Sequence, residues 1–497
     1  MAVFDQHLTQ LSLAELPPGS RLYFLGIAGT GMASIAGLCQ EAGFKVCGSD
    51  QAAYQPTAGQ LQASGIPVYS PYGQQNLEEA NPDVLIVGNA ISRGNPELEY
   101  WINAGRPLCS FPQVLGEYFL SRKTSMVITG THGKTTTTAL SAYLLAQLGE
   151  DPGWLIGGVP QDDSQSYHLG KGRVFVSEGD EYDTAFFDKG AKFLHYRPQI
   201  LLINNLEHDH VDIYPDFDSL LVMFARLIER TREEGGAIVA NSDSPGVRQL
   251  LAVTGLDREA NGPRLLTFRA GDGPLARAIT YGKSHYHPVQ QRWVAPIYSE
   301  RWGFLDVATK LPGQHNIANI AGMLGCLSLL AERGELKGGW GKSELLAALA
   351  CFGGVKKRCE FLGTFRGAPV YHDFAHHPTA VAKMIEIFAS LHPDRRLIVA
   401  FDPKNASSRR NIFMDQYVQA FIRAKVTLIG ACRQELRIAA DQRMNIEELA
   451  HRIGPSAHAF HDNQALLSWV HAEANKDDVI VFLSCGDFSD IPRRLIQ

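Results

Sequence analysis

The feature that most constrains the fold is the stretch VITGTHGKTTTTA at residues 127–139, where an apolar strand runs into a glycine-rich loop and then a helix. A complete phosphate loop reads G-x-x-x-x-G-K-[ST], but Ile128 stands where the first glycine belongs. The rest keeps its physical logic, because backbone N–H groups and the helix dipole still face an anion. This strand–loop–helix unit predicts an α/β fold that binds a nucleotide phosphate.

The residues of this loop have distinct expected roles. Lys134 is able to reach the outer phosphates, and the Thr135 hydroxyl suits Mg²⁺. A plain helix start rich in threonine and glycine is the alternative interpretation. The residues expected to contact the nucleotide are Gly130, Thr131, His132, Gly133, Lys134, Thr135 and Thr136.

Further magnesium ligands are expected at the ends of neighbouring strands. Mg²⁺ prefers oxygen ligands and keeps several waters, so one or two more protein groups suffice. Open α/β sheets place their ligands at the carboxyl ends of the strands. The candidates are Glu178 in VFVSEGDE and the cluster 207–210 after LLINN. Ordinary solvated charge is the alternative for both, because charged residues are usually exposed.

A second glycine turn, GIAGTGM at residues 26–32, lies between the expected strand RLYFLG and a helix from about Gly31 to Ala42. Its spacing is G-x-x-G-x-G, whereas the dinucleotide pattern is G-x-G-x-x-G. If Gly29 and Gly31 are taken as the first two glycines of that pattern, Ser34 stands at the third. Its backbone donors still suit a pyrophosphate, and Asp50 ends the second strand, where an acidic residue commonly meets a ribose hydroxyl. By itself, this turn leaves an NAD-binding domain open.

Length and strand rhythm predict three α/β domains in series. A chain of 497 residues is too long for one core. Short apolar strands that end in polar residues recur along it, as in DVLIVGN, QILLINN and DVIVFLSCGD. The small-residue stretch ALACFGGVKK marks one boundary, and 160–172 reads as a polar loop. We expect a Rossmann-like N-terminal domain (1–120), a P-loop-type central domain (121–350) and a Rossmann-like C-terminal domain (351–497), each with a largely parallel sheet.

Composition argues against several other classes of protein. A net charge of −6 without a long basic run disfavours a nucleic-acid partner. The eight cysteines form no C-x-x-C, which disfavours a zinc site and a disulfide framework. No apolar run reaches the ~18 residues that cross a bilayer, and the N-terminus does not resemble a signal peptide. The sequence predicts a cytoplasmic protein without a membrane partner; the oligomeric state stays open, with a monomer as one option.

Taken in order along the chain, these motifs resemble those of the Mur ligases, ATP-dependent amide-forming enzymes of bacterial cell-wall synthesis. TGTHGKTTT is similar to the family's ATP loop, which also lacks the first glycine, and GIAGTGM to its turn for UDP-N-acetylmuramate. LPGQHNIANIAG (311–322) resembles the adenine-side motif, and GGVKKRCEF followed by HDFAHHPTA resembles the C-terminal signature. The resemblance covers essentially the whole chain.

The resemblance implies roles for matched residues in an Mg-ATP site. Thr135 and Glu178 would bind a first Mg²⁺ and His210 a second, which favours His210 over His208. His315, Asn316 and Asn319 would contact the adenosine. Arg358 would face the γ-phosphate, with Asp373 and His376 beside it. The implied catalytic set is Lys134, Glu178, His210, Arg358, Asp373 and His376.

Substrate residues follow from the same resemblance. The implied contacts with UDP-N-acetylmuramate and the acceptor are Ala28, Gly29, Thr30, Gly31, Met32, Asp50, Asn89 and Lys404. Two departures stand out. No lysine occurs from Asp209 to Glu233, where some members carry a carbamylated lysine. In FDPKNASSRR (401–410), Lys404 replaces an expected arginine, and lysine is a point charge instead of a bidentate fork.

Three stretches favour one branch of the family: GNAISRGNPELE (88–99), EGDEYDTAFFDKGAKFLHYRP (178–198) and NNLEHDHVDIY (204–214). They resemble members that join UDP-N-acetylmuramate to the peptide L-alanyl-γ-D-glutamyl-meso-diaminopimelate in cell-wall peptide recycling. The resemblance implies an acyl-phosphate intermediate with ATP and Mg²⁺ as cofactors. A member that adds L-alanine alone is the alternative.

Overall fold

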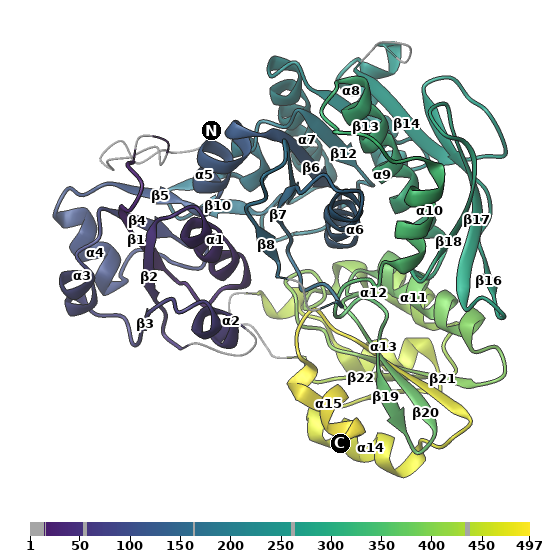
Figure 1. The fold of residues 1–497 in the computed structure, drawn as a ribbon. Coiled ribbons are helices and arrows are strands. Elements are labelled where there is room, and N and C mark those ends of the chain that lie inside the picture. Colours follow the sequence, from purple (N-terminus) through teal and green to yellow (C-terminus); the bar gives the residue numbers. More distant parts are fainter. Residues whose placement is uncertain (1–13, 15, 53–56, 163–164, 260–263, 433–437) are drawn as a thin grey trace.

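Three α/β units follow one another along the chain in the computed structural model (Figure 1). The structure describes residues 14, 16–52, 57–162, 165–259, 264–432 and 438–497. Most of the N-terminal segment for which we expected no signal peptide therefore lies outside the described residues. Among the described helices, none combines the length and the apolar character that a membrane crossing requires.

The N-terminal unit is a five-stranded parallel sheet in the order β3-β2-β1-β4-β5. Its strand order reverses beside β1, which is where open α/β sheets form a ligand crevice. The glycine turn leads from β1 directly into α1. The bounds are β1 (Arg21–Leu25), α1 (Thr30–Glu41), β2 (Lys45–Ser49), α2 (Thr57–Ala63), β3 (Val68–Tyr69), α3 (Gln74–Ala80), β4 (Val84–Val87), α4 (Pro96–Asn103) and β5 (Leu108–Ser110).

The central unit is built on an eleven-stranded sheet whose middle is parallel and whose two edges are antiparallel. The helices α6 (Lys134–Gln147) and α9 (Gln314–Glu332) bury most of their residues against it. The other helices are α7 (Phe217–Glu233), α8 (Pro245–Val253) and α10 (Lys342–Cys351). The strands are β6 (Thr124–Thr129), β7 (Gly153–Leu155), β8 (Tyr167–His168), β9 (Val174–Glu178), β12 (Ile200–Ile203), β13 (Ala237–Asn241), β14 (Leu265–Ala270), β15 (Ala278–Tyr281), β16 (His285–His287), β17 (Arg292–Ser299) and β18 (Gly303–Thr309).

One sequence expectation for this unit is wrong. The stretch 160–172 was expected to be a loop throughout, but it contains β8, which pairs antiparallel with β7. Tyr167 of β8 is buried against α1 of the N-terminal unit, where a Cβ atom on Gly37 would lie 2.2 Å from its ring. The strand forms because a docking surface from another unit covers it.

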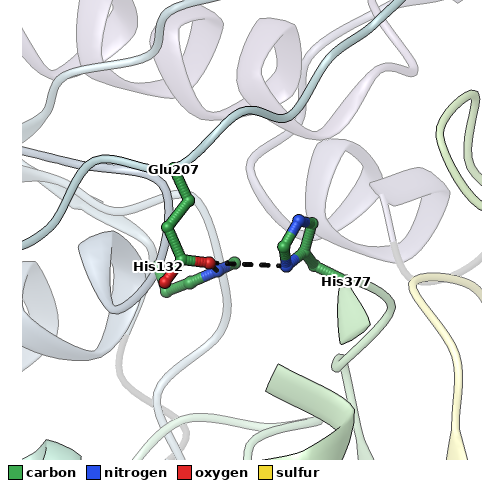
Figure 2. Close-up of side chains that lie close together, drawn as sticks. All are labelled: His132, Glu207 and His377. Carbon is green, nitrogen blue, oxygen red and sulfur yellow. Dashed lines mark hydrogen bonds and ion pairs between the residues drawn. The ribbon is translucent and has the colours of Figure 1, made fainter. Parts of the chain in front are cut away.

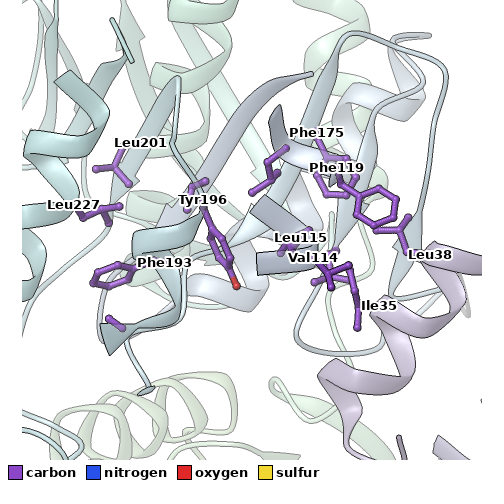
Figure 3. Packing of buried hydrophobic residues seen from close by; sticks show 14 of the residues in the cluster. Ile35, Leu38, Val114, Leu115, Phe119, Phe175, Phe193, Tyr196, Leu201 and Leu227 are labelled. Carbon is purple, nitrogen blue, oxygen red and sulfur yellow. The ribbon is translucent and has the colours of Figure 1, made fainter. Parts of the chain in front are cut away.

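The N-terminal and central units share one apolar core (Figure 3). Ile35 and Leu38 of α1 belong to the same buried cluster as Phe119, Phe175 of β9 and Leu201 of β12. A small hairpin, β10 (Asp183–Ala185) with β11 (Asp188–Ala191), adds Ala185 and Phe187 to the other face of the N-terminal sheet. These two units are therefore joined by extensive apolar burial, the dominant favourable term in such contacts.

The C-terminal unit carries a six-stranded sheet in the order β19-β20-β24-β21-β22-β23, parallel except for the β19–β20 pair. Separate apolar clusters cover its two faces. The expected three-domain α/β architecture with largely parallel sheets is confirmed. The bounds are β19 (Glu360–Phe365), β20 (Ala368–Asp373), α11 (Pro378–Leu391), β21 (Arg396–Phe401), α12 (Met414–Phe421), β22 (Val426–Ile429), α13 (Ile446–Ile453), β23 (Ala457–Ala459), α14 (Asn463–Glu473), β24 (Asp478–Leu483) and α15 (Ile491–Ile496).

Candidate active site

A cleft of about 2180 Å³ is lined by residues from all three units. Most of the residues singled out from the sequence line it. They are Gly29, Thr30, Gly31, Met32, Asn89, Thr131, His132, Gly133, Lys134, Thr135, Thr136, Glu178, His210, His315, Asn316, Asn319, Arg358, Asp373 and His376. The chain therefore brings segments from residue 29 to residue 376 to one cavity.

The phosphate loop has the backbone shape that its glycines predict. Gly130 and Gly133 have φ angles of 127° and 84°, in the region that glycine favours. A Cβ atom on Gly130 would lie 2.7 Å from the Asn205 carbonyl oxygen, and one on Gly133 would lie 2.7 Å from Asn319 Oδ1. Both glycines are thus needed for close packing as well as for conformation. The Thr131 N–H donates to the Asn205 carbonyl oxygen, which ties the loop to the end of β12.

Lys134 lies at the centre of a buried charge cluster. Its Nζ donates to the Gly130 carbonyl oxygen at 2.7 Å and lies 2.9 Å from Glu181 Oε1. Burial opposes the charge on Lys134, but Glu181 and the neighbouring carboxylates outweigh it and raise the pKa of the lysine. Lys134 is therefore fully cationic near neutral pH and already placed at the helix start. The sequence motifs did not identify Glu181 as a site residue, although it lies only three residues beyond Glu178.

The predicted magnesium ligands lie together. Thr135 Oγ1 donates to Glu178 Oε1 at 3.1 Å, and the Gly157 N–H donates to Glu178 Oε2. His210 Nε2 lies 3.0 Å from Glu181 Oε1. Two buried atoms, Glu181 Oε2 and His210 Nδ1, have no hydrogen-bond partner in the part of the chain that the structure describes. Unpartnered buried polar atoms are rare, and this oxygen-rich set fits the ligands that Mg²⁺ prefers.

Two C-terminal residues complete this end of the cleft. Arg358 Nη2 lies 3.4 Å from Thr135 Oγ1, and the guanidinium stacks 4.2 Å from the Phe374 ring centroid. Asp373 accepts the N–H groups of Cys359 and Ala375, so it shapes the backbone beside Arg358. An arginine from one domain thus reaches the phosphate loop of another.

Figure 2 shows a contact between the phosphate loop and the C-terminal unit through His132, Glu207 and His377. Glu207 Oε2 lies 3.2 Å from His132 Nε2 and 3.6 Å from His377 Nδ1. Burial opposes the charge of Glu207, yet the two histidines help to hold its pKa at about 2. Among the described residues, this is the one group of three His, Cys or acidic side chains whose ligand atoms all lie within 4.8 Å, so it could also hold a metal ion.

Asp209 makes a second contact between the same two units. Ser407 Oγ donates to Asp209 Oδ1 at 2.6 Å, and His376 Nε2 lies 3.6 Å from Asp209 Oδ2. His208, by contrast, turns to the Tyr214 carbonyl oxygen and does not line the cleft. The sequence motifs assign Asp209 no role beyond membership of the polar cluster 207–210. Its partners lie far along the chain, so no local pattern indicates this contact.

The adenine-side motif opens α9. Gly313 precedes the helix with a φ of 86°, and Asn316 Nδ2 donates to the Pro312 carbonyl oxygen. Asn319 Nδ2 donates to Asn316 Oδ1 at 3.0 Å. Burial lowers the pKa of His315 to about 3, so this imidazole is neutral at physiological pH. Asn319 lies beside the phosphate loop, because its side chain faces Gly133.

Four predicted residues do not line this cleft. Asp50 accepts the Ala28 N–H at 2.9 Å and the Tyr72 hydroxyl, so it holds the glycine turn and faces an adjoining cavity of about 500 Å³. Ala28 belongs to this turn, and Gly130 belongs to the phosphate loop, where its carbonyl oxygen accepts from Lys134 Nζ. Lys404 Nζ pairs with Asp487 Oδ1 at 3.1 Å. Asp50 and Lys404 thus each have a partner in the protein, and their contact with substrate stays a prediction.

Comparisons with known proteins match this architecture. Three domain families cover the chain: "Mur ligase family, catalytic domain" at residues 21–123, "Mur ligase middle domain" at 128–327 and "Mur ligase, glutamate ligase domain" at 357–486. The UDP-N-acetylmuramate–L-alanyl-γ-D-glutamyl-meso-2,6-diaminoheptandioate ligase of Escherichia coli is 33% identical, over 96% of this chain and 98% of the relative. The UDP-N-acetylmuramate–L-alanine ligase of Treponema pallidum is 31% identical, over 94% of each chain.

Solved structures give the same picture. A murein peptide ligase from Psychrobacter arcticus superposes with a TM-score of 0.68 at 28% identity, covering 96% of this chain and 98% of that one. The UDP-N-acetylmuramate–alanine ligase of Thermotoga maritima has a TM-score of 0.74 at 22% identity, with the same coverage. At that identity, the second likeness shows the fold alone.

Proposed function

Because the chain belongs to the Mur ligase family, whose members are ATP-dependent amide-forming ligases, we propose that it joins UDP-N-acetylmuramate to L-alanyl-γ-D-glutamyl-meso-diaminopimelate. Two relatives that carry this activity in their names are 33% and 30% identical over 96% of the chain. Such a reaction would reuse a peptide released from the cell wall. The three domains would bind the UDP-sugar (1–120), Mg-ATP (121–350) and the acceptor peptide (351–497).

The observation that carries the proposal is the single cleft that joins the phosphate loop to elements of both other domains. A ligase of three substrates needs all of them in one cavity, because positioning supplies much of the rate. Thr30 and Gly31 of the glycine turn line this cleft, as do Arg358 and His376 of the C-terminal unit. The nucleotide would lie between them, on the loop and the start of α9.

In the proposed reaction, the carboxylate of the muramate attacks the γ-phosphorus of ATP, the bond from that phosphorus to the bridging oxygen breaks, and ADP leaves as the acyl phosphate forms. The amine of the acceptor then attacks the acyl carbon, and inorganic phosphate leaves. Lys134 and Arg358, which both lie at the phosphate loop, would offset negative charge that spreads over the phosphoryl oxygens. Bound Mg²⁺, held by Thr135, Glu178 and His210, would supply the charge that lets two anions approach.

The contacts between domains support a closed active site. Glu207 and Asp209 of the central domain each contact a histidine of the C-terminal domain, next to the phosphate loop. Holding the C-terminal domain there would exclude water, which protects an acyl phosphate from hydrolysis. His376 would be oriented by Asp209 and by the Tyr417 hydroxyl, which donates to its carbonyl oxygen.

A second candidate is the ligase that adds L-alanine alone, since relatives with that name are 31% identical over 94% of the chain. An ADP-release assay with UDP-N-acetylmuramate separates the two. We expect kcat/KM for the tripeptide to exceed that for L-alanine by at least about 100-fold, because binding energy from remote substrate groups promotes catalysis. A preference for L-alanine would reject the peptide-ligase assignment and retain the family.

A further inference from the structure

The acceptor end of the cleft carries a group of cationic and imidazole side chains that the reaction described above does not use. Lys357 precedes β19, His372 lies on β20 and Arg493 lies on α15. All three line the cleft on the C-terminal domain, beyond Arg358. Lys357 and Arg493 are close enough to His372 to disfavour its protonated form. We call this group the basic pocket.

His372 is buried without a full set of partners. Its side chain is 5% exposed, and its Nε2 has no hydrogen-bond partner within the described ranges. Burial, followed by the charges of Lys357 and Arg493, lowers the pKa of His372 to about 4. A neutral imidazole with an unpaired nitrogen in a cleft wall is costly to maintain unless a ligand completes it.

Within the described residues, neither Lys357 nor Arg493 forms an ion pair with a carboxylate. Lys357 Nζ donates to the Gly486 carbonyl oxygen at 2.9 Å. Arg493 makes no ion pair or hydrogen bond with another described residue, although its neighbour Arg494 donates to Gln464 Oε1 at 2.8 Å. The nearby Asp487 is already paired with Lys404. Asp490 also lines the cleft without an ion pair among the described residues.

The backbone around the basic pocket is strained. Phe488, Ser489 and Asp490 are three consecutive residues with φ angles of 50°, 54° and 58°, and Lys357 has a φ of 58°. Such angles are uncommon for residues other than glycine. Strain of this kind clusters at ligand-binding segments, where the surrounding structure holds it in place.

We propose that the basic pocket binds the carboxylates at the far end of the acceptor peptide, with Asp490 facing the ammonium group of the same residue. The inference rests on the proposed function, because it places a diamino diacid at the third position of the acceptor. That residue carries two carboxylates and an ammonium group, and the reacting amine lies at the other end of the peptide. L-alanine has no such second end, so the pocket would select a peptide over a single amino acid.

Arginine suits this role because its planar guanidinium binds a carboxylate with two parallel hydrogen bonds. Arg493 is the member without a partner among the described residues, whereas Lys357 already donates to the Gly486 carbonyl oxygen. His372 Nε2 would gain the partner that it lacks in the described chain. The same ligand would thus satisfy an unpaired cation and an unpaired buried nitrogen.

The test compares Arg493→Ala with the matched variant Arg494→Ala, which lies on the same helix but does not line the cleft. Steady-state kinetics use two acceptors, the tripeptide and the dipeptide L-alanyl-γ-D-glutamate, at saturating Mg-ATP and UDP-N-acetylmuramate. Arg493→Ala should raise KM for the tripeptide about tenfold, the usual scale for one charge-assisted contact, and change kcat much less. KM for the tripeptide should then approach KM for the dipeptide. Arg494→Ala should keep the wild-type preference.

Several outcomes would overturn the proposal. An unchanged KM for the tripeptide in Arg493→Ala would contradict the proposal. An equal rise in KM for both acceptors would also contradict it, because Arg493 would then not bind the third residue of the peptide. Arg493→Lys should restore part of the preference for the tripeptide, because lysine keeps the positive charge but cannot form two parallel hydrogen bonds. If Arg493→Lys restores no preference while both variants melt at the wild-type temperature, the proposal is contradicted. A wild-type enzyme that ignores the tripeptide would reject the proposed function itself, which is a separate result.

Discussion

The nucleotide end and the acceptor end of the cleft are built in different ways. At the nucleotide end, Lys134 pairs with Glu181 and Thr135 pairs with Glu178, on a regular strand–loop–helix. At the acceptor end, β20 and α15 are flanked by segments with left-handed backbone, and Arg493 has no partner in the described chain. The difference indicates a preorganised catalytic end and a recognition end that a substrate completes.

This difference fits the demands on each end. Stabilising a phosphoryl transition state requires charges that are fixed before the reaction, because reorganisation costs rate. Choosing one acceptor over another requires groups that are satisfied only by the correct ligand. Changes at the nucleotide end should therefore lower turnover with every acceptor, whereas changes at the acceptor end should alter KM selectively.

The largest effect is expected for Lys134→Ala. Loss of this cation should lower ligation by at least about 10³-fold with either acceptor, because it offsets charge on the transferred phosphoryl group. Binding of UDP-N-acetylmuramate, measured by calorimetry, should persist. Lys189→Ala is the control, since Lys189 is exposed and pairs with Asp183 outside the cleft. Wild-type turnover in Lys134→Ala would refute the role of the loop.

Glu178→Gln should have the next largest effect. The substitution keeps the side-chain shape but removes the negative charge that faces Thr135. We expect kcat to fall about 100-fold and the Mg²⁺ concentration for half-maximal rate to rise, because Mg²⁺ favours carboxylate ligands. A magnesium titration of the rate measures both. A variant with an unaltered magnesium requirement would show that Glu178 does not bind the metal.

A smaller effect is expected for Lys404→Ala at the acceptor end. Lys404 is partly exposed and paired with Asp487, and such pairs contribute little. KM for the tripeptide should rise about threefold or less, well below the change in Arg493→Ala. If Lys404→Ala were the more damaging of the two, the 401–410 loop would bind the acceptor carboxylate, as the sequence implied.

A different quantity, acid stability, should change at the contact between the central and C-terminal units. Burial lowers the pKa of His377 to about 4, whereas it is about 6.5 in an unfolded chain. Between these values the unfolded state binds more protons, so stability falls as pH drops from 6.5 to 4, by up to about 1.4 kcal/mol per pH unit. His377 Nδ1 accepts the Thr379 N–H at the start of α11.

His377→Asn keeps an acceptor at this helix start and removes the titrating group. The free energy of unfolding, measured by urea denaturation at pH 7 and pH 4.5, should therefore fall less in the variant than in the wild type. The same pH dependence in both proteins would mean that a proton on His377 is tolerated in the folded state.

The parts that could be predicted from the sequence are those with local causes. The phosphate loop was predictable because a strand, two glycines and a helix start lie within twelve residues. Lys134, Thr135 and Glu178 meet because the ends of neighbouring parallel strands converge on one edge of a sheet. The identity of the C-terminal partner Arg358 came from family resemblance, since no local pattern places it at the loop.

The parts that could not be predicted depend on contacts between distant segments. Asp209 and Ser407 are 198 residues apart, so nothing near either residue indicates their hydrogen bond. Lys404 pairs with Asp487 from another loop, and no local pattern indicates that ion pair. Arg493 lies on a helix of six residues without a motif. Its exposure to the cleft results from how β24 and the strained segment after it are placed.

The central claim is that this chain ligates a peptide to UDP-N-acetylmuramate. The most direct test is mass spectrometry of the product formed from UDP-N-acetylmuramate, Mg-ATP and an equimolar mixture of L-alanine, the dipeptide and the tripeptide. We predict that the UDP-N-acetylmuramoyl tripeptide dominates and that one ADP is released for each product. A product that carries only L-alanine would contradict the claim.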